Sequence, residues 1–454
     1  MVQDLYILMI TAGIVSLLFK WLKQPVVLGY IVAGILVGPN LAGENIVNPE
    51  NVKAWGEIGV LFVLFCIGLE FRLKKMFESG KTAFVGVATI VVGMLLLGYG
   101  VGRVSGLDNM NSMFLAAMLC MSSTTIVMKA VDEAGWSKER FVQGATSILI
   151  LEDIIAVVLM VLLSNIATSN SFDAVVMLKT IGVLAATLVI WFIVGILVIP
   201  TIIRKARTYL NDETLIIIAL GLCMGMVLTA EEAGFSSALG AFVMGMILAE
   251  TLESHRIEKL MSPLKNVFAA IFFVSVGMMI NPASLVTYWA PILLVAVVVI
   301  VGMITFGTLG CWWGGETLKD AMCTGFSFVQ IGEFSFIIAT LGNQLGVIDE
   351  AIYPIIVAAS VLTTFLTPYI MKTGVPCYNF IYNHASPKVK AAIDAREQKV
   401  AQMEQKTDTN PSSETKMKNH HQKMNKILSH TFITKRMVNL FIKNMTENDK
   451  KIEN

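Results

Sequence analysis

The chain has 454 residues, of which 55% are hydrophobic and only 15% charged, and its formal net charge is +1. A soluble domain carries about 25% charged residues, so this deficit excludes an ordinary soluble enzyme, a disordered chain and a secreted disulfide scaffold. With a mean hydropathy of +0.71, the composition predicts an all-α polytopic membrane protein.

Apolar stretches long enough to cross a bilayer follow one another along most of the chain. A transmembrane helix needs about 20 predominantly apolar residues, and by this criterion we predict 13 spans. They cover 5–22, 25–43, 56–72, 82–103, 112–130, 141–164, 175–200, 213–232, 235–250, 264–281, 285–310, 320–345 and 350–372. The first stretch lacks the basic region and cleavage site of a signal peptide, so we expect it to be a retained helix.

Basic residues fall mainly on one side of the predicted membrane. With the N-terminus outside, the cytoplasmic connections up to Lys372 carry 17 Lys and Arg residues, Lys265 among them, and the outer connections carry 3. By the positive-inside rule, this predicts a cytoplasmic C-terminal tail, and we expect the cell (inner) membrane of a prokaryote. We expect Glu70 and the basic residues after it to form a charged helix end.

Residues 376–454 form a polar, basic tail with 14 Lys and Arg against 8 Asp and Glu. Its stretch 399–426 is typical of disorder. The stretch 427–443 favours a short basic amphipathic helix that is either solvated or adsorbed to anionic membrane lipid.

The six cysteines form no Cys-x-x-Cys pair, and no phosphate-binding glycine motif follows a strand pattern. We therefore expect no cofactor, no nucleotide-binding domain and no nucleic-acid partner.

Two adjacent carboxylates, Glu152 and Asp153, lie halfway along the predicted span 141–164 in the sequence LILEDIIA. Ionisable groups at this depth are expensive and indicate function or pairing. Adjacent helical positions point about 100° apart, so we expect one carboxylate to line a site while the other faces a neighbouring helix.

Two further spans carry polar interruptions. Ser122, Ser123, Thr124 and Thr125 can bond their own backbone and break the fifth span, and Gln330, Gly332 and Glu333 interrupt the twelfth. The two interruptions lie seven spans apart. Because seven is odd, the span triplets 4–6 and 11–13 would have opposite orientations in the membrane. Such inverted repeats with broken helices are typical of secondary transporters.

Gly34 and Gly38 form a small-residue face that serves either packing within one protomer or a dimer contact.

Taken together and in this order, the motifs resemble those of the Kef-type monovalent cation:proton antiporters, a family with the NhaA-like fold. The resemblance covers roughly residues 20–372. It rests on QPVVLGYIVAGILVGP (24–39), EIGVLFVLFCIGLEF (57–71), SSTTIV (122–127), LEDIIAVV (151–158), GFSSALGAFVMGMILAET (234–251), IFFVSVGMMINP (271–282) and QIGEFSF (330–336).

The resemblance implies a 1–375 transmembrane antiporter domain in a homodimer, followed by the largely disordered tail. Dimer-side helices would lie within 1–80 and 213–282, and a moving ion-carrying core within 82–164 and 285–372. Asp153 would be the essential cation and proton carboxylate, and hence the Na⁺ or K⁺ ligand, with Glu152 in its partner's place. The unwound stretch would contribute Ser123, Thr124 and Thr125, supported by Gln330 and Glu333.

Three features depart from many relatives: Met303 where a lysine is common, Glu152 where the glutathione-gated potassium-efflux branch has Gln, and no nucleotide-binding domain. We therefore expect a free-standing transporter, not an enzyme, that exchanges Na⁺ or K⁺ for H⁺ by an elevator-type mechanism.

The residues leave open two alternative functions: a cation uniporter or channel, and an ion sensor without proton coupling. A membrane aspartyl protease is disfavoured, because Asp153 is the one clear mid-span aspartate.

Overall fold

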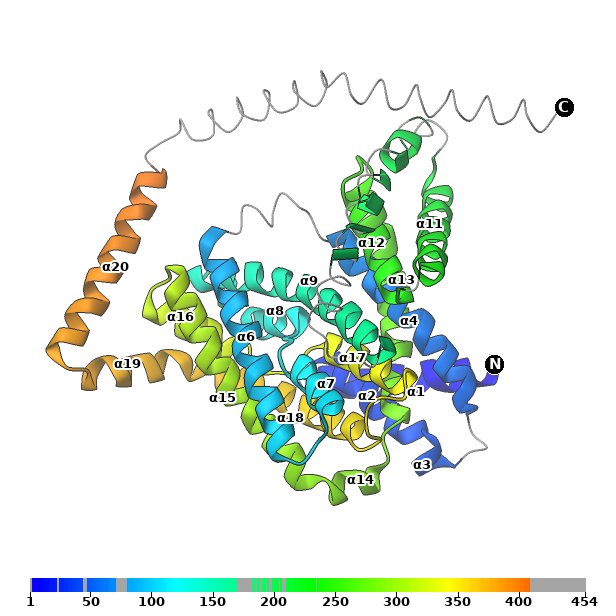
Figure 1. The fold of residues 1–454 in the computed structure, drawn as a ribbon, viewed down its shortest axis with the longest axis horizontal. Coiled ribbons are helices and arrows are strands. Elements are labelled where there is room, and N and C mark those ends of the chain that lie inside the picture. Colours follow the sequence, from blue (N-terminus) through cyan, green and yellow to red (C-terminus); the bar gives the residue numbers. More distant parts are fainter. Residues whose placement is uncertain are drawn as a thin grey trace. The chain divides into compact units, whose positions relative to one another are not determined.

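The computed structural model describes residues 2–22, 24–43, 47–70, 80–169, 210–233 and 235–408, with parts of 182–205. The regular structure in these ranges is entirely helical (Figure 1). The helices are α1 (Val2–Trp21), α2 (Val26–Val37), α3 (Pro39–Ala42), α4 (Pro49–Glu70), α6 (Gly80–Val104), α7 (Asn109–Leu119), α8 (Thr124–Glu133), α9 (Arg140–Ser169), α11 (Asp212–Glu232), α12 (Ser237–Ala249), α13 (Ser254–Met278), α14 (Pro282–Thr287), α15 (Trp289–Gly314), α16 (Leu318–Ser327), α17 (Glu333–Gln344), α18 (Ile352–Lys372), α19 (Gly374–His384) and α20 (Pro387–Asp408).

The all-α membrane fold is confirmed, whereas the number of spans is not. Within the described residues, 9 stretches are long and apolar enough to cross a membrane. The predicted spans 25–43 and 235–250 occur as the shorter helices α2 and α12, and span 320–345 is divided between α16 and α17. The predicted span 175–200 lies largely outside the described residues.

Helix α13 begins at Ser254, ten residues before the predicted start of its span. The early start brings Lys265 and Asn266 into the middle of the helix. The charge of Lys265 is accommodated there because Glu70, the last residue of α4, forms an ion pair with it. Such a partner on another helix is not visible from the local sequence.

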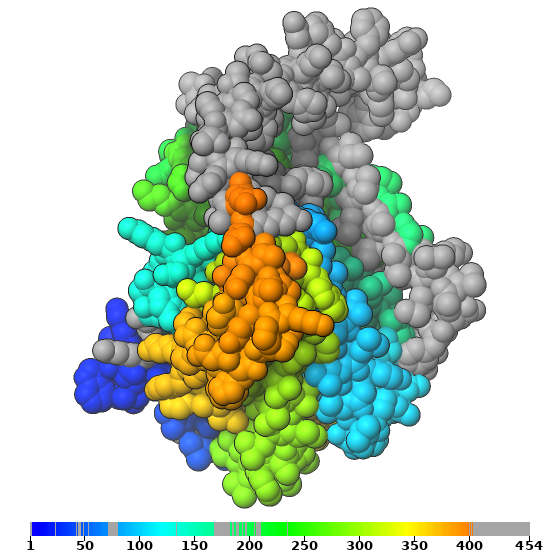
Figure 2. All heavy atoms as spheres, turned by 90° about the vertical axis from the view of Figure 1, so that its left-hand side faces the viewer, coloured from blue at the N-terminus to red at the C-terminus, as the bar shows by residue number. Residues whose placement is uncertain are grey.

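The helices pack into two sets. We call α1, α2, α4, α11, α12 and α13 the first helix set, in which α4 packs on α12 and α13, and α2 on α1 and α13. The second helix set comprises α6, α7, α8, α9, α15, α16, α17 and α18, with α6 against α15, α7 and α9. Figure 2 shows α6 in light blue beside α15 in yellow-green. Contacts are extensive within each set and sparse between them.

Glycines let the helices of the first set approach closely. A methyl group added at Gly34 of α2 would lie 2.1 Å from the carbonyl oxygen of Val274 in α13, and one at Gly68 of α4 would lie 2.3 Å from that of Phe242 in α12. The Gly34 face therefore serves packing within the protomer, one of the two roles that its sequence allowed.

The helical part of the tail is longer than the sequence predicts. Helix α19 packs on α16 and α18 and belongs to the first compact unit, Met1–Ala385. The second unit begins at Ser386 and contains α20, so residues 399–408 are helical where we expect disorder. Ala, Glu, Gln, Lys and Arg, which favour helix, dominate this segment. The stretch 427–443 lies outside the described residues.

We expect Gly34→Ala to destabilise the protein, because the added methyl would push α2 from α13. Overpacking of this kind costs about 1–3 kcal/mol, which a lower thermal unfolding midpoint in detergent would report. The matched control is Gly13→Ala in α1, where nothing lies within 4 Å of the added carbon. Equal midpoints for the two variants would contradict this account of the packing.

Candidate functional site

The hydroxyl run of the fifth predicted span interrupts a helix, as its composition indicates. Helix α7 ends at Leu119 and α8 begins at Thr124. Between them Ser123 is extended, with φ −95° and ψ 117°, and its hydroxyl accepts a hydrogen bond of 3.3 Å from the amide of Ile126. A serine in this geometry is a typical N-cap, so the run ends one helix and starts the next.

The second interruption separates α16, which ends at Ser327, from α17, which begins at Glu333. The two interruptions cross in direct contact. The amide of Gly332 donates to the carbonyl of Met121 at 2.7 Å, and the Ser122 hydroxyl donates to the carbonyl of Phe328 at 3.3 Å. A methyl group at Gly332 would lie 2.6 Å from the carbonyl of Ser122. The crossing therefore requires glycine at this position.

Hydroxyl groups of α18 satisfy much of the second interruption. The Ser360 hydroxyl donates to the carbonyl of Ile331 at 2.9 Å, and the amide of Ile331 donates to the Thr363 hydroxyl at 3.3 Å. The oxygen of Thr367 lies 3.3 Å from Oε1 of Gln330. Non-helical backbone at membrane depth needs such internal partners.

The crossing also holds two residues that the sequence analysis singles out. Gln330 is fully buried and donates through Nε2 to the carbonyl of Ser123 at 3.3 Å, so it links one interruption to the other. Met303 of α15 is equally buried, and its sulfur lies 3.9 Å from the Ser122 hydroxyl. A neutral thioether thus packs against the crossing at this position.

Glu152 and Asp153 differ in their surroundings although they are neighbours in α9. Glu152 is 1% exposed, and its Oε2 accepts a hydrogen bond of 3.1 Å from the amide of Ser122. Asp153 is only partly buried, and no hydrogen bond to its carboxylate is found from the described residues. The two side chains have different surroundings because adjacent helical positions point about 100° apart. Glu152 supplies the acceptor for the amide of Ser122 at the crossing, whereas the carboxylate of Asp153 accepts no hydrogen bond from the described residues.

Further oxygens at the site have no hydrogen-bond partner within the described part of the chain. They are Oε1 of Glu152 and Oγ1 of Thr124, the first residue of α8. Thr125, next along α8, is exposed. Ser123 uses its hydroxyl as the cap of α8 and its carbonyl as the acceptor for Gln330. These oxygens and Asp153 are the hard donors that a monovalent metal cation prefers.

The charges that act on Asp153 come from four helices. They belong to Glu152 of α9, Glu333 of α17, Glu70 of α4 and Lys265 of α13. Glu333 is the first residue of α17 and is partly buried. The positive end of the α17 dipole therefore lies at Glu333.

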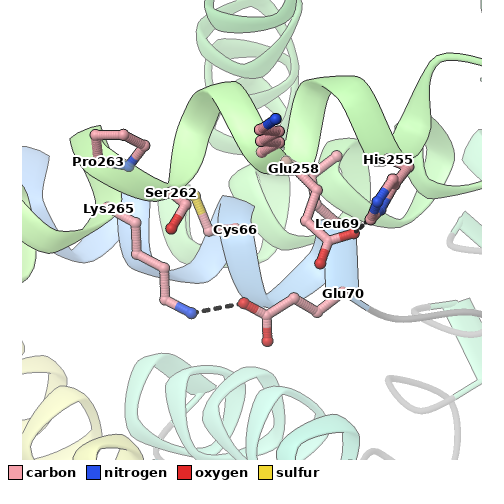
Figure 3. A pocket seen from close by; sticks show the side chains of 9 residues that line it. Cys66, Leu69, Glu70, His255, Glu258, Ser262, Pro263 and Lys265 are labelled. Carbon is pink, nitrogen blue, oxygen red and sulfur yellow. Dashed lines mark hydrogen bonds and ion pairs between the residues drawn. The ribbon is translucent and has the colours of Figure 1, made fainter.

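A cavity of about 350 Å³ lies between α4 and α13. Figure 3 shows its lining, in which Nζ of Lys265 lies 2.7 Å from Oε1 of Glu70. The other lining residues are Cys66, Leu69, His255, Glu258, Lys259, Ser262 and Pro263. Both members of the ion pair also act electrostatically on Asp153.

Sequence reasoning missed this ion pair and the hydroxyls of α18. Glu70 was expected at a charged helix end, and Lys265 in a cytoplasmic connection. One available signal was the isolated Lys265 in an apolar stretch. Another was the spacing of Ser360, Thr363 and Thr367, which places three hydroxyls on one face of a helix.

Comparison with known proteins gives a consistent result. The family model described as "Sodium/hydrogen exchanger, transmembrane" matches residues 6–373. K(+) efflux antiporter 6 of Arabidopsis thaliana is 30% identical over 380 residues, 82% of this chain and 63% of that protein. The Na(+)/H(+)-K(+) antiporter GerN of Bacillus cereus is 28% identical over 354 residues, 77% of this chain and 90% of GerN.

The chain thus spans slightly less than two thirds of the length of the Arabidopsis relative. Both relatives are antiporters by name and hence transporters, not enzymes, which confirms the resemblance drawn from the motifs. The structure of the sodium proton antiporter MjNhaP1 from Methanocaldococcus jannaschii has a TM-score of 0.61 with this one. Its sequence identity is 16%, and the match covers 82% of this chain and 97% of that chain. This likeness confirms the fold.

We expect Glu152→Leu to unfold at a lower temperature than Glu152→Gln. Glutamine keeps an acceptor for the buried amide of Ser122, whereas leucine leaves that amide without a partner, at a cost of about 1–3 kcal/mol. Thermal unfolding in detergent measures the difference. As a control, Asp153→Leu and Asp153→Asn should differ less, because Asp153 accepts no such bond. A leucine variant as stable as the glutamine variant at position 152 would contradict the role of Glu152 in the crossing.

Proposed function

Because the chain belongs to the sodium/hydrogen exchanger transmembrane family, we propose that it exchanges a monovalent cation, Na⁺ or K⁺, for protons across a membrane. Asp153 is the carboxylate that binds the two ions in turn. The observation that carries this assignment is the contrast within α9. Asp153 is partly exposed with no hydrogen bond from a described residue, whereas Glu152 is buried and held by Ser122.

Exchange follows from competition for one carboxylate. When Asp153 is ionised it binds a dehydrated cation, and the Thr124 hydroxyl and Oε1 of Glu152 supply further oxygens. When a proton binds Asp153, the negative charge is lost and the cation is released. An ionised but empty carboxylate crosses a low-dielectric barrier poorly, so only the loaded forms move. That restriction couples the two ions and prevents leak.

The movement is of the elevator type: the second helix set carries Asp153 past the first. Sparse contacts between the sets and dense contacts within each support this division. The first helix set forms the dimer contact of a homodimer. The protein lies in the inner membrane of a prokaryote with its N-terminus outside and its tail in the cytoplasm, which the distribution of basic residues supports.

The names of the relatives keep both Na⁺ and K⁺ as candidate substrates, since GerN carries both in its name and the Arabidopsis relative only K⁺. An uncoupled cation uniporter is the alternative. It would use the same carboxylate without a proton, and only flux separates the two.

We expect Asp153→Asn to abolish exchange, because the amide binds neither a cation nor a proton in the way a carboxylate does. The assay uses liposomes with a trapped pH dye and an imposed pH gradient, to which Na⁺, K⁺ or choline is added. Wild-type protein should dissipate the gradient with Na⁺ or K⁺ and not with choline, and the ranking of the ions identifies the substrate.

The control for this experiment is Glu152→Gln, which removes the neighbouring charge and keeps the bond to Ser122. We expect this variant to retain exchange with an altered ion preference. Near-normal exchange by Asp153→Asn would refute Asp153 as the shared carboxylate. Cation flux in wild-type protein without proton movement would establish the uniporter.

A further inference from the structure

Side-chain hydrogen bonds join the two helix sets at two places within the described residues. Nε2 of Gln344, the last residue of α17, donates to Oε1 of Glu57 in α4 at 2.8 Å. Nζ of Lys129 in α8 donates at 2.7 Å to the carbonyl of Gln24, which lies two residues before the start of α2. Each bond therefore connects half of an interrupted helix in the second set to the first set.

The two bonds lie on opposite sides of the crossing. Lys129 belongs to α8, the half-helix that follows the first interruption, and Gln344 belongs to α17, which follows the second. Helix α17 packs beside α7, the half-helix that precedes the first interruption, so α8 and α17 leave the crossing in opposite directions. In the orientation proposed above, Gln344 meets Glu57 on the outer side and Lys129 meets Gln24 on the cytoplasmic side.

Closer to the crossing, α17 also meets the first helix set through an apolar contact. Phe336 of α17 and Phe273 of α13 are both buried, and their rings lie edge to face with centroids 6.0 Å apart. Apolar rings lose no directional partner when they slide, whereas a hydrogen bond weakens steeply outside a narrow range of distance and angle. Where packing between the sets is sparse, the two hydrogen bonds therefore resist a sliding movement more than the ring contact does.

We propose that the Gln344–Glu57 bond is a latch that holds the second helix set against the first and must open before that set moves, with the Lys129–Gln24 bond as its counterpart on the other side. This inference rests on the proposed function, because it assigns the bonds a role in the movement that carries Asp153. Gln344 and Glu57 are both exposed, so water replaces their bond when the latch opens. The latch thus sets how fast the sets move and leaves the affinity for ions unchanged.

The first test changes the strength of the latch and measures the maximal rate of exchange in the liposome assay. Gln344→Ala removes the donor and should raise the rate about two- to fivefold, whereas Gln344→Lys converts the bond to an ion pair and should lower the rate by a similar factor. Neither substitution should change the cation KM. Adding Glu57→Gln to Gln344→Lys removes the ion pair and should return the rate close to the wild-type value.

The matched controls for this test lie one position away in α17. Asn343 is exposed like Gln344, but the bond to Glu57 comes from Gln344. Asn343→Ala and Asn343→Lys should therefore leave the rate unchanged. Equal effects of the substitutions at the two positions would refute the latch. A lower rate in Gln344→Ala would also refute it, because that is the result of a bond that only stabilises the fold.

A reversible bridge tests whether the two ends of the latch separate during exchange. Cysteines that replace Glu57 and Gln344 are joined by a short bis-methanethiosulfonate and released with dithiothreitol. The bridge should abolish exchange, and reduction should restore it. The control pair replaces Asp212 of α11 and Arg256 of α13, which are 2.6 Å apart within the first helix set, and its bridge should leave exchange intact.

Wild-type protein treated with the same reagent reports the effect of the native thiols. Undiminished exchange with the bridge between positions 57 and 344 in place would refute the latch.

The rate at which this bridge forms in detergent does not depend on transport. Lys129→Met removes the counterpart bond, so positions 57 and 344 should meet less often and bridge about twofold more slowly. Lys129→Arg keeps a donor and should not slow the bridging.

These readouts separate failure of the latch from failure of the proposed function. Slower bridging in Lys129→Met, without exchange in wild-type protein, would refute the proposed function and support the latch. Exchange in wild-type protein, with equal bridging in both Lys129 variants and unchanged rates in the Gln344 variants, would refute only the latch. Equal bridging without wild-type exchange would refute both.

Discussion

The structure depends on a single constraint: non-helical backbone within a membrane must find its hydrogen bonds inside the protein. Two helices are interrupted, and the interruptions satisfy each other. The amide of Gly332 bonds to Met121, the Ser122 hydroxyl to Phe328, and Gln330 to Ser123. Because the backbones meet at contact distance, a side chain at position 332 would collide with Ser122. This requirement explains the glycine in the twelfth predicted span.

The same constraint accounts for the unequal roles of the two carboxylates. The amide of Ser122 has no partner in its own helix, so Glu152 of α9 serves as acceptor. That bond fixes the rotation of α9 about its axis, and Asp153, one residue on, must then point elsewhere. Glu152 is in this sense a structural precondition for the exposure of Asp153.

The sequence was sufficient for the features that act locally. The hydroxyl run at 122–125 predicts the interruption of a helix because such side chains bond their own backbone, and the pair at 152–153 stands out as charge in an apolar stretch. The sequence alone could not show which charged side chains pair between helices that are distant along the chain. Lys265 and Glu70 are 195 positions apart and meet only because α4 and α13 pack together. The start of α13 was misplaced for the same reason, since a lysine without a visible partner marks the edge of a span.

The placement of the ion pair has a consequence for the proposed movement. Glu70 and Lys265 belong to the first helix set, and Asp153 belongs to the second. If the second set carries Asp153 past the first, the distance between the carboxylate and the pair changes during transport, whereas Glu152 and Glu333 travel with it. Under the proposed movement, Glu152 and Glu333 would stay with Asp153 in the second helix set, and Glu70 and Lys265 would stay in the first. Because Coulomb interaction falls with distance, the electrostatic surroundings of Asp153 would then differ between the two ends of the proposed movement.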